Sequence, residues 1–389
     1  MEKTGSRASI VPIILAATLN WAAPREALAQ GTWVTKTPMP TARWQSSVGL
    51  IGEQIYVANG YNPAIGGALT QVEAYNIVSN SWVSKPPQPF LQDAAAYSVI
   101  NGLLYIAGGG NCCVGIANAN AYNPGTDSWT SLAALPQAEE FPAGDTINGL
   151  FYVAGVNYTT PTTTTLDVFN PGSGLWTAKT SMPTPRYFPG ACAINGILYV
   201  VGGSDPNTGN GLSTVEAYNP ATDSWTTKAS MPTPRTRVAV AELNGILYAI
   251  GGASREGLNP TIMHAVEAYD PTLNVWTEQP IMPTARASLQ AVAANGSIYA
   301  IGGYASNEYT AFSTVEAFTP SPAISIQMYP GITINAPVGS TNEIQYVNNL
   351  GNSNWMTLTN LVLPITPYIY VDFTAPGQSQ RFYRDILVQ

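Results

Sequence analysis

Arginines at a recurring position are the residues most suited to chemistry in this chain. They lie 17 positions before the second residue of a repeated glycine pair, and two other copies carry Gln92 and Glu139 there. A guanidinium grips a carboxylate or a planar amide through two parallel hydrogen bonds, which lysine cannot do. With one tyrosine from a nearby loop, the candidate ligand-binding residues are Arg43, Arg186, Arg235, Arg286, Gln92, Glu139 and Tyr304.

Acidic residues also recur, nine positions before a tryptophan. They are Glu73, Asp167, Glu216 and Glu267, and Glu316 takes the same place in the last copy. Buried charges are tolerated mainly when they are paired. These acids and the arginines could therefore form ion pairs that tie the repeats together. We favour this structural role for the acids because they occur in nearly every copy, whereas for the arginines both roles stay open.

Metal and cofactor chemistry has little support. His264 is the only histidine, so a zinc or copper site with several histidines is excluded. The chain has no glycine-rich phosphate loop, Ser-His-Asp set or metal-spaced cysteines, and we expect no metal and no cofactor. Its three cysteines, Cys112, Cys113 and Cys192, argue against a disulfide framework, although a bridge between Cys112 and Cys113 stays open.

Composition indicates an all-β protein. Only 10% of the 389 residues are charged, while 45% are hydrophobic and glycine (35) and proline (31) are plentiful. This mixture is typical of many short strands joined by tight turns. The net charge of −8 would repel a phosphate backbone, so nucleic-acid binding is not expected.

The first 29 residues resemble an export signal. Lys3 and Arg7 precede a mostly apolar stretch from Ile10 to Ala23, and Ala27-Leu28-Ala29 supplies a small-x-small cleavage pattern. The stretch is too short to span a bilayer comfortably. We therefore expect a mature chain that begins at Gln30 and is secreted, periplasmic or extracellular, without membrane insertion.

One unit repeats six times between residues 30 and 321. From each tryptophan to the second residue of the next glycine pair there are 27 positions in all six copies, so the length varies only between the pair and the next tryptophan. The tryptophans are Trp33, Trp82, Trp129, Trp176, Trp225 and Trp276. Such a period predicts a repeat architecture.

Each copy predicts four short strands. In the fourth copy these are Tyr187 to Ala193, Ile197 to Val201, Val215 to Tyr218 and a strand around Trp225. A lone sheet of this kind has two apolar faces, and six of them arranged radially cover one another. The sixth copy lacks its tryptophan strand, while Gly31 to Val34 supplies an extra one at the start. We therefore predict a six-bladed β-propeller closed by the N-terminal strand.

The Gly-Gly, Tyr and Trp pattern resembles the kelch repeat over residues 31–320, and the propeller would be similar to the central domain of galactose oxidase. The third copy departs from the pattern, with Gly155-Val156 and Phe169. The resemblance implies that arginines and variable loops on one rim hold acidic or polar ligands. The loop residues would be Tyr61, Asn111, Tyr158, Asp205, Arg255, Glu256, Tyr304 and Tyr309.

This resemblance leaves two functions open. Galactose oxidase needs two histidines for its copper, which this chain lacks. We therefore expect a non-catalytic binding or attachment protein, a monomer, with a protein or carbohydrate ligand. The alternative is a metal-free sugar epimerase or mutarotase, for which Glu139 and Glu256 are the acid/base carboxylates to test.

Residues 322–389 no longer follow the repeat. Alternating segments such as Ile332 to Ile334, Ile344 to Val347 and Tyr368 to Val371 predict further strands. We expect a small domain resembling a β-sandwich, fibronectin-like by analogy of fold alone. It resembles the accessory C-terminal domains of exported bacterial proteins, which bind or attach.

Overall fold

The computed structural model describes residues 31–320, except 112–113, 158, 258 and 306–309, and the segments 331–334, 341–347, 356–362, 368–371 and 382–388. Residues 29–321 form one compact unit, and the chain from residue 322 belongs to another. The predicted export signal (1–29) and the Cys112–Cys113 pair lie outside the described residues. Cys192 is buried as a free thiol.

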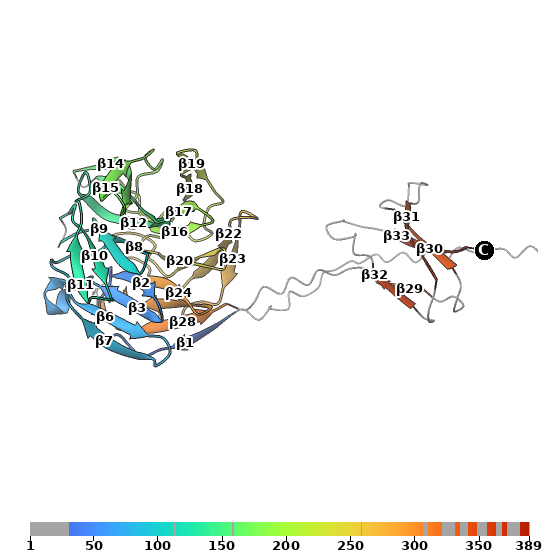
Figure 1. Cartoon of the computed structure of the whole chain (residues 1–389), viewed down its shortest axis with the longest axis horizontal. Coiled ribbons are helices and arrows are strands. Elements are labelled where there is room, and N and C mark those ends of the chain that lie inside the picture. Colours follow the sequence, from blue (N-terminus) through green and yellow to red (C-terminus); the bar gives the residue numbers. More distant parts are fainter. Residues whose placement is uncertain are drawn as a thin grey trace, which may run out of the picture. The chain divides into compact units, whose positions relative to one another are not determined.

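Six antiparallel sheets of four strands surround a common axis (Figure 1). The innermost strands are β2 (Ser47–Ile51), β8 (Ala96–Ile100), β12 (Glu139–Ile147), β16 (Gly190–Ile194), β20 (Ala239–Leu243) and β24 (Gln290–Ala294). The second strands are β3 (Gln54–Ala58), β9 (Leu103–Ala107), β13 (Leu150–Asn157), β17 (Ile197–Val201), β21 (Ile246–Ile250) and β25 (Ser297–Ile301). We number the blades 1 to 6 in this order.

The outer half of each blade follows in the same order. The third strands are β6 (Val72–Asn76), β10 (Ala119–Asn123), β14 (Thr160–Asn170), β18 (Val215–Asn219), β22 (Val266–Asp270) and β28 (Val315–Thr319). The outermost strands are β7 (Ser81–Lys85), β11 (Ser128–Ser131), β15 (Leu175–Ala178), β19 (Ser224–Thr227), β23 (Val275–Gln279) and β1 (Thr32–Thr35). The rim loops add β4 (Tyr61–Asn62), the short helix η1 (Pro63–Ile65), β5 (Gly67–Ala68), β26 (Tyr304–Ala305) and β27 (Thr310–Ala311).

The N-terminal strand closes the ring, as predicted. Strand β1 pairs antiparallel with β28, which places Trp33 opposite Phe318. Blade 6 therefore takes its outermost strand from the start of the chain, and no separate edge is left between the first and last blades.

The core lies between neighbouring blades because both faces of each sheet are apolar. Between blades 3 and 4, for example, Tyr152 and Val168 pack against Leu198 and Tyr218. The six repeat tryptophans add a polar tie at the outer edge. Each indole Nε1–H donates to a carbonyl just after the outermost strand of the preceding blade, at 2.7–3.2 Å. These tryptophans therefore join blade to blade.

The second glycine of each pair allows two main-chain segments to meet. Gly109 has φ +83°, and a Cβ there would lie 2.3 Å from the carbonyl oxygen of Asp93. Blade 3 has Val156 instead, and its β13 and β14 stay paired through Gly155 and Val156 as far as Asn157. Where the second glycine is absent, the second and third strands therefore stay paired for longer instead of separating at the glycine pair.

The C-terminal unit contains five described strands. β29 (Gly331–Ile334) pairs with β32 (Tyr368–Val371), and β30 (Thr341–Val347) pairs with both β31 (Met356–Val362) and β33 (Phe382–Val388). Strands were expected in this region, and the sandwich-like arrangement stays a prediction.

Candidate functional site

The recurring arginines are buried inside the blades. In blade 4, Arg186 is 0% exposed, and its Nη2 lies 2.5 Å from Glu216 Oε2. Its Nη1 donates to the carbonyls of Gly202 at 3.1 Å and Thr214 at 3.0 Å. These two carbonyls lie where the second and third strands diverge. The guanidinium therefore holds the divergence together while neutralising the buried carboxylate.

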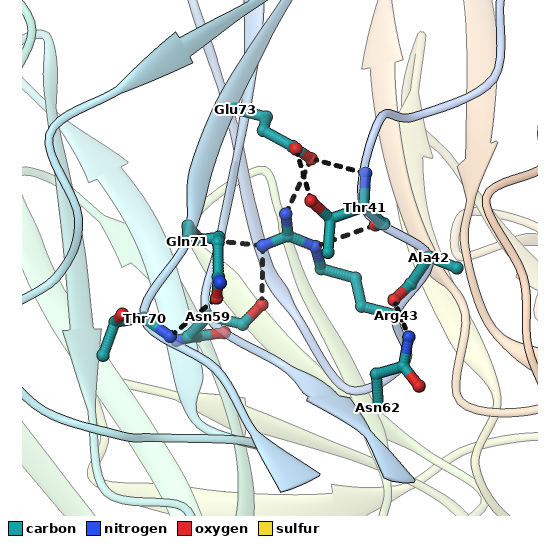
Figure 2. A network of polar contacts seen from close by, with 8 residues as sticks. All are labelled: Thr41, Ala42, Arg43, Asn59, Asn62, Thr70, Gln71 and Glu73. Atoms are coloured by element: carbon teal, nitrogen blue, oxygen red, sulfur yellow. Dashed lines mark hydrogen bonds and ion pairs between the residues drawn. The ribbon is translucent and has the colours of Figure 1, made fainter. Parts of the chain in front are cut away.

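Blades 1, 5 and 6 repeat this arrangement. Figure 2 shows Arg43, whose Nη2 lies 2.6 Å from Glu73 Oε2 and whose Nη1 donates to the carbonyls of Asn59 and Gln71. The Thr41 hydroxyl occupies the other carboxylate oxygen at 2.7 Å. The matching pairs are Arg235–Glu267 and Arg286–Glu316.

The main chains of three of these arginines connect their blades to the preceding blade in the ring. They are Arg43, Arg235 and Arg286. Arg235 N–H donates to Leu212 of blade 4, and its carbonyl accepts from Gly203 N–H. Burial lowers the pKa of Arg286 to about 10, against the opposing effect of Glu316, so the side chain stays charged at neutral pH. This geometry supports the structural role of the arginines. Their direct contact with a ligand remains a prediction.

Blades 2 and 3 fill this position without a cation. In blade 2, the Gln92 amide is buried, accepts from Gln88 and donates to the Gly108 carbonyl at 2.6 Å. It thus keeps one of the two arginine bonds. The acidic position there is Asn120, which is also buried.

Blade 3 places two acids together. Glu139 is 0% exposed and interacts with Asp167, which is also buried. Among the described residues neither has an ion-pair partner. Burial raises the pKa of Glu139 well above its usual range, and the Asp167 carboxylate raises it further. A carboxyl so deeply buried is not placed to exchange a proton with a ligand on the rim.

The predicted loop residues divide into three groups. Tyr304 is only 2% exposed and packs edge-on against Trp44, with ring centroids 4.4 Å apart. The exposed side chains are those of Asn111 and Arg255, and the half-buried ones are those of Tyr61, Asp205 and Glu256. Tyr158 and Tyr309 lie outside the described residues.

A ring of six residues surrounds the axis two positions after the arginine position. We call Gln45, Ala94, Phe141, Phe188, Arg237 and Ser288 the axial ring. All six have φ between 47° and 57°, in the left-handed region, at a cost of about 1 kcal/mol each for such residues. Main-chain bonds support this conformation: Ala94 N–H donates to Gln45, Gln45 to Ser288, Ser288 to Arg237 and Arg237 to Phe188.

All six residues of the axial ring line one pocket on the propeller axis. Phe141 and Phe188 stack with their ring centroids 3.7 Å apart, and the Arg237 guanidinium lies 3.6 Å from the centre of the Phe188 ring. The Tyr97 hydroxyl donates to Gln290, and both of these side chains also line the pocket. The pocket therefore combines aromatic surface with a cation and polar groups, which is typical of ligand sites.

Glu256, in the variable loop of blade 5, contacts the pocket residue Arg237. Its carboxylate binds Arg237, with Nη2 to Oε2 at 2.5 Å and Nε to Oε2 at 2.8 Å. The Thr236 hydroxyl donates to Glu256 Oε1 at 2.7 Å. Of the predicted rim residues, Glu256 is the one that forms an ion pair with Arg237, which lines the pocket.

Sequence reasoning missed the axial ring because its members belong to five residue types with no shared chemistry. The available signal was positional: a fixed offset of two residues from the recurring arginine, present in every copy. Within the part of the chain that the structure describes, no cluster of three acidic, histidine or cysteine side chains suits a metal ion. The same part contains no helix of the length and hydrophobicity that crossing a bilayer requires.

Comparison with known proteins agrees with this geometry. The kelch motif matches residues 43–89, 185–232, 234–283 and 285–321, which are the four copies that carry the arginine. Curated proteins give no significant match. Among many solved structures of similar fold, the one titled "Structure of YjhT" shares 18% identity at a TM-score of 0.61, covering 72% of this chain and 96% of that one. At this identity the likeness concerns the fold alone. Residues 31–320 of the chain form a kelch-repeat β-propeller.

Proposed function

We propose that this protein is an exported binding or attachment protein that holds its ligand, a glycan or a protein, in the pocket of the axial ring. Kelch propellers are suited to binding, because six rigid sheets hold the loops of one rim in place. A glycan is the ligand that this pocket suits best. Export rests on the signal-like first 29 residues.

The observation that carries this proposal is the stack of Phe141, Phe188 and Arg237 inside the pocket. All three side chains are half-buried, so each keeps accessible surface. The apolar face of a sugar ring packs well on aromatic surface, while its hydroxyls bond to polar side chains such as Gln45 and Ser288. Six left-handed residues at one register are strained, and such strain tends to be retained at functional sites.

Alanine replacement in the stack tests the proposal. A glycan array first identifies the glycans that the unmodified protein binds. Phe141→Ala removes aromatic surface from the pocket and should weaken the affinity for these glycans about tenfold or more. Leu175→Ala is the matched control, because Leu175 is 63% exposed on outermost strand β15. Binding that survives Phe141→Ala unchanged would place the ligand elsewhere.

Glu256 supports a second candidate function. Its carboxylate is half-buried and binds the pocket residue Arg237, whereas Glu139 is fully buried. A metal-free epimerase or mutarotase needs one such carboxylate as acid and base. Polarimetry on purified protein distinguishes the two functions, because turnover that Glu256→Gln abolishes would identify an enzyme.

A further inference from the structure

The Arg237 guanidinium already has a carboxylate partner from its own chain. Glu256 accepts from Nε at 3.0 and 2.8 Å and from Nη2 at 2.5 Å. The remaining nitrogen, Nη1, donates to the Ser288 hydroxyl at 3.2 Å. Glu256 therefore occupies the edge of the guanidinium that would otherwise grip a ligand carboxylate in a two-point bond.

Glu256 is held in this position from two further sides. Its N–H donates to the Gly209 carbonyl of the neighbouring loop in blade 4 at 2.7 Å. The Thr236 hydroxyl donates to Oε1. The side chains of Arg237 and Glu256 are only 13% and 21% exposed, so water screens their attraction incompletely.

An anionic ligand would meet an unfavourable field in this pocket. It would have to displace Glu256 from Arg237 or lie beside its carboxylate, and the chain carries a net charge of −8. An uncharged ligand can instead use the phenylalanine surface and the polar groups while the ion pair stays intact. Specificity of this kind comes from repelling the wrong ligand as much as from attracting the right one.

We propose that Glu256 is a specificity-determining residue that makes the axial pocket select uncharged glycans over carboxylated ones. This inference rests on the proposed function, because it concerns the same pocket. Glu256 thereby acts by masking Arg237, and its removal should convert the pocket to one that accepts acidic sugars.

Matched pairs of sugars provide the test. Galactose and galacturonate oligomers of equal length are titrated into the full chain at low salt by calorimetry. The unmodified protein should bind the neutral oligomer more tightly. Glu256→Gln, which keeps the side-chain length, should strengthen binding of the galacturonate oligomer about tenfold, the gain of one charge-assisted contact. Glu278→Gln, on the exposed face of β23, changes the net charge equally and should alter neither affinity.

The outcomes separate this inference from the proposed function. If the unmodified protein prefers galacturonate, or if Glu256→Gln leaves its affinity for galacturonate unchanged, Glu256 does not determine specificity. If neither oligomer binds, or if Phe141→Ala does not weaken binding, the pocket itself is not the glycan site and the proposed function fails first.

Discussion

Blades 3 and 4 have the same strand order but carry opposite charges at the recurring arginine position. Blade 4 inserts Arg186 between two diverging strands and pairs it with Glu216. Blade 3 has Glu139 beside Asp167 at these positions, and its strands stay paired further. The difference shows that the ion pair is one way to stabilise the divergence and that a longer hairpin is another.

The two blades differ in the charge that their buried side chains carry. The pair in blade 4 is charged and internally neutralised. In blade 3 the raised pKa of Glu139 means that it takes up a proton on folding. In blade 3, protonation of this carboxyl is therefore coupled to folding.

The largest expected effect comes from breaking the pair in blade 4. Arg186→Ala leaves Glu216 buried without its cation and should lower the free energy of unfolding by about 3–5 kcal/mol. Denaturant unfolding at neutral pH measures this loss. The double variant Arg186→Ala/Glu216→Gln should recover part of it, and a loss below about 1 kcal/mol for the single variant would contradict the structural role.

A smaller effect is expected when the second glycine of the pair in blade 4 is replaced by valine, the residue that blade 3 has at this position. Gly203 has φ +98°, and a Cβ there would lie 2.9 Å from the Tyr187 carbonyl oxygen. Gly203→Val adds a branched side chain in this strained conformation and should cost about 2–3 kcal/mol. The thermal midpoint measures it, with Val156→Ala in blade 3 as the comparison. A thermal midpoint that Gly203→Val leaves unchanged would contradict this role of the glycine.

The smallest effect, and the one with a pH signature, is expected from Glu139→Gln. Because the pKa of Glu139 is higher in the folded than in the unfolded chain, its contribution is fully present below the unfolded value and is lost as pH rises through the folded value. The variant should therefore be more stable than the unmodified protein at alkaline pH, by about 1–2 kcal/mol.

Unfolding curves from pH 4 to pH 9 check this prediction, because the difference should grow with pH and vanish in acid. Leu175→Ala provides a comparison that changes no titratable group, because Leu175 is exposed on β15, and its effect should stay constant over this range. A difference between Glu139→Gln and the unmodified protein that did not vary with pH would show that Glu139 titrates normally.

Much of the fold could be predicted because each copy of the repeat encodes the same four strands. Strand β17 has the predicted bounds, Ile197 to Val201, since an unbroken apolar run between a tight turn and a glycine pair leaves one interpretation. The closing strand at Trp33 followed from the missing strand of the sixth copy. The site was harder to predict, because charge at a fixed spacing does not reveal whether a side chain points into a blade or toward a ligand.

The sequence by itself determined the six-fold repeat and the strand that closes the ring, because these depend on residue type and spacing. It left open whether the recurring arginines pair with the acids or contact a ligand. Only the tertiary structure decided that the arginines are buried and that Phe141, Phe188 and Arg237 meet on the axis. These three residues come from separate blades and lie far apart along the chain. They come together because a closed ring brings the same register of every blade to one axis.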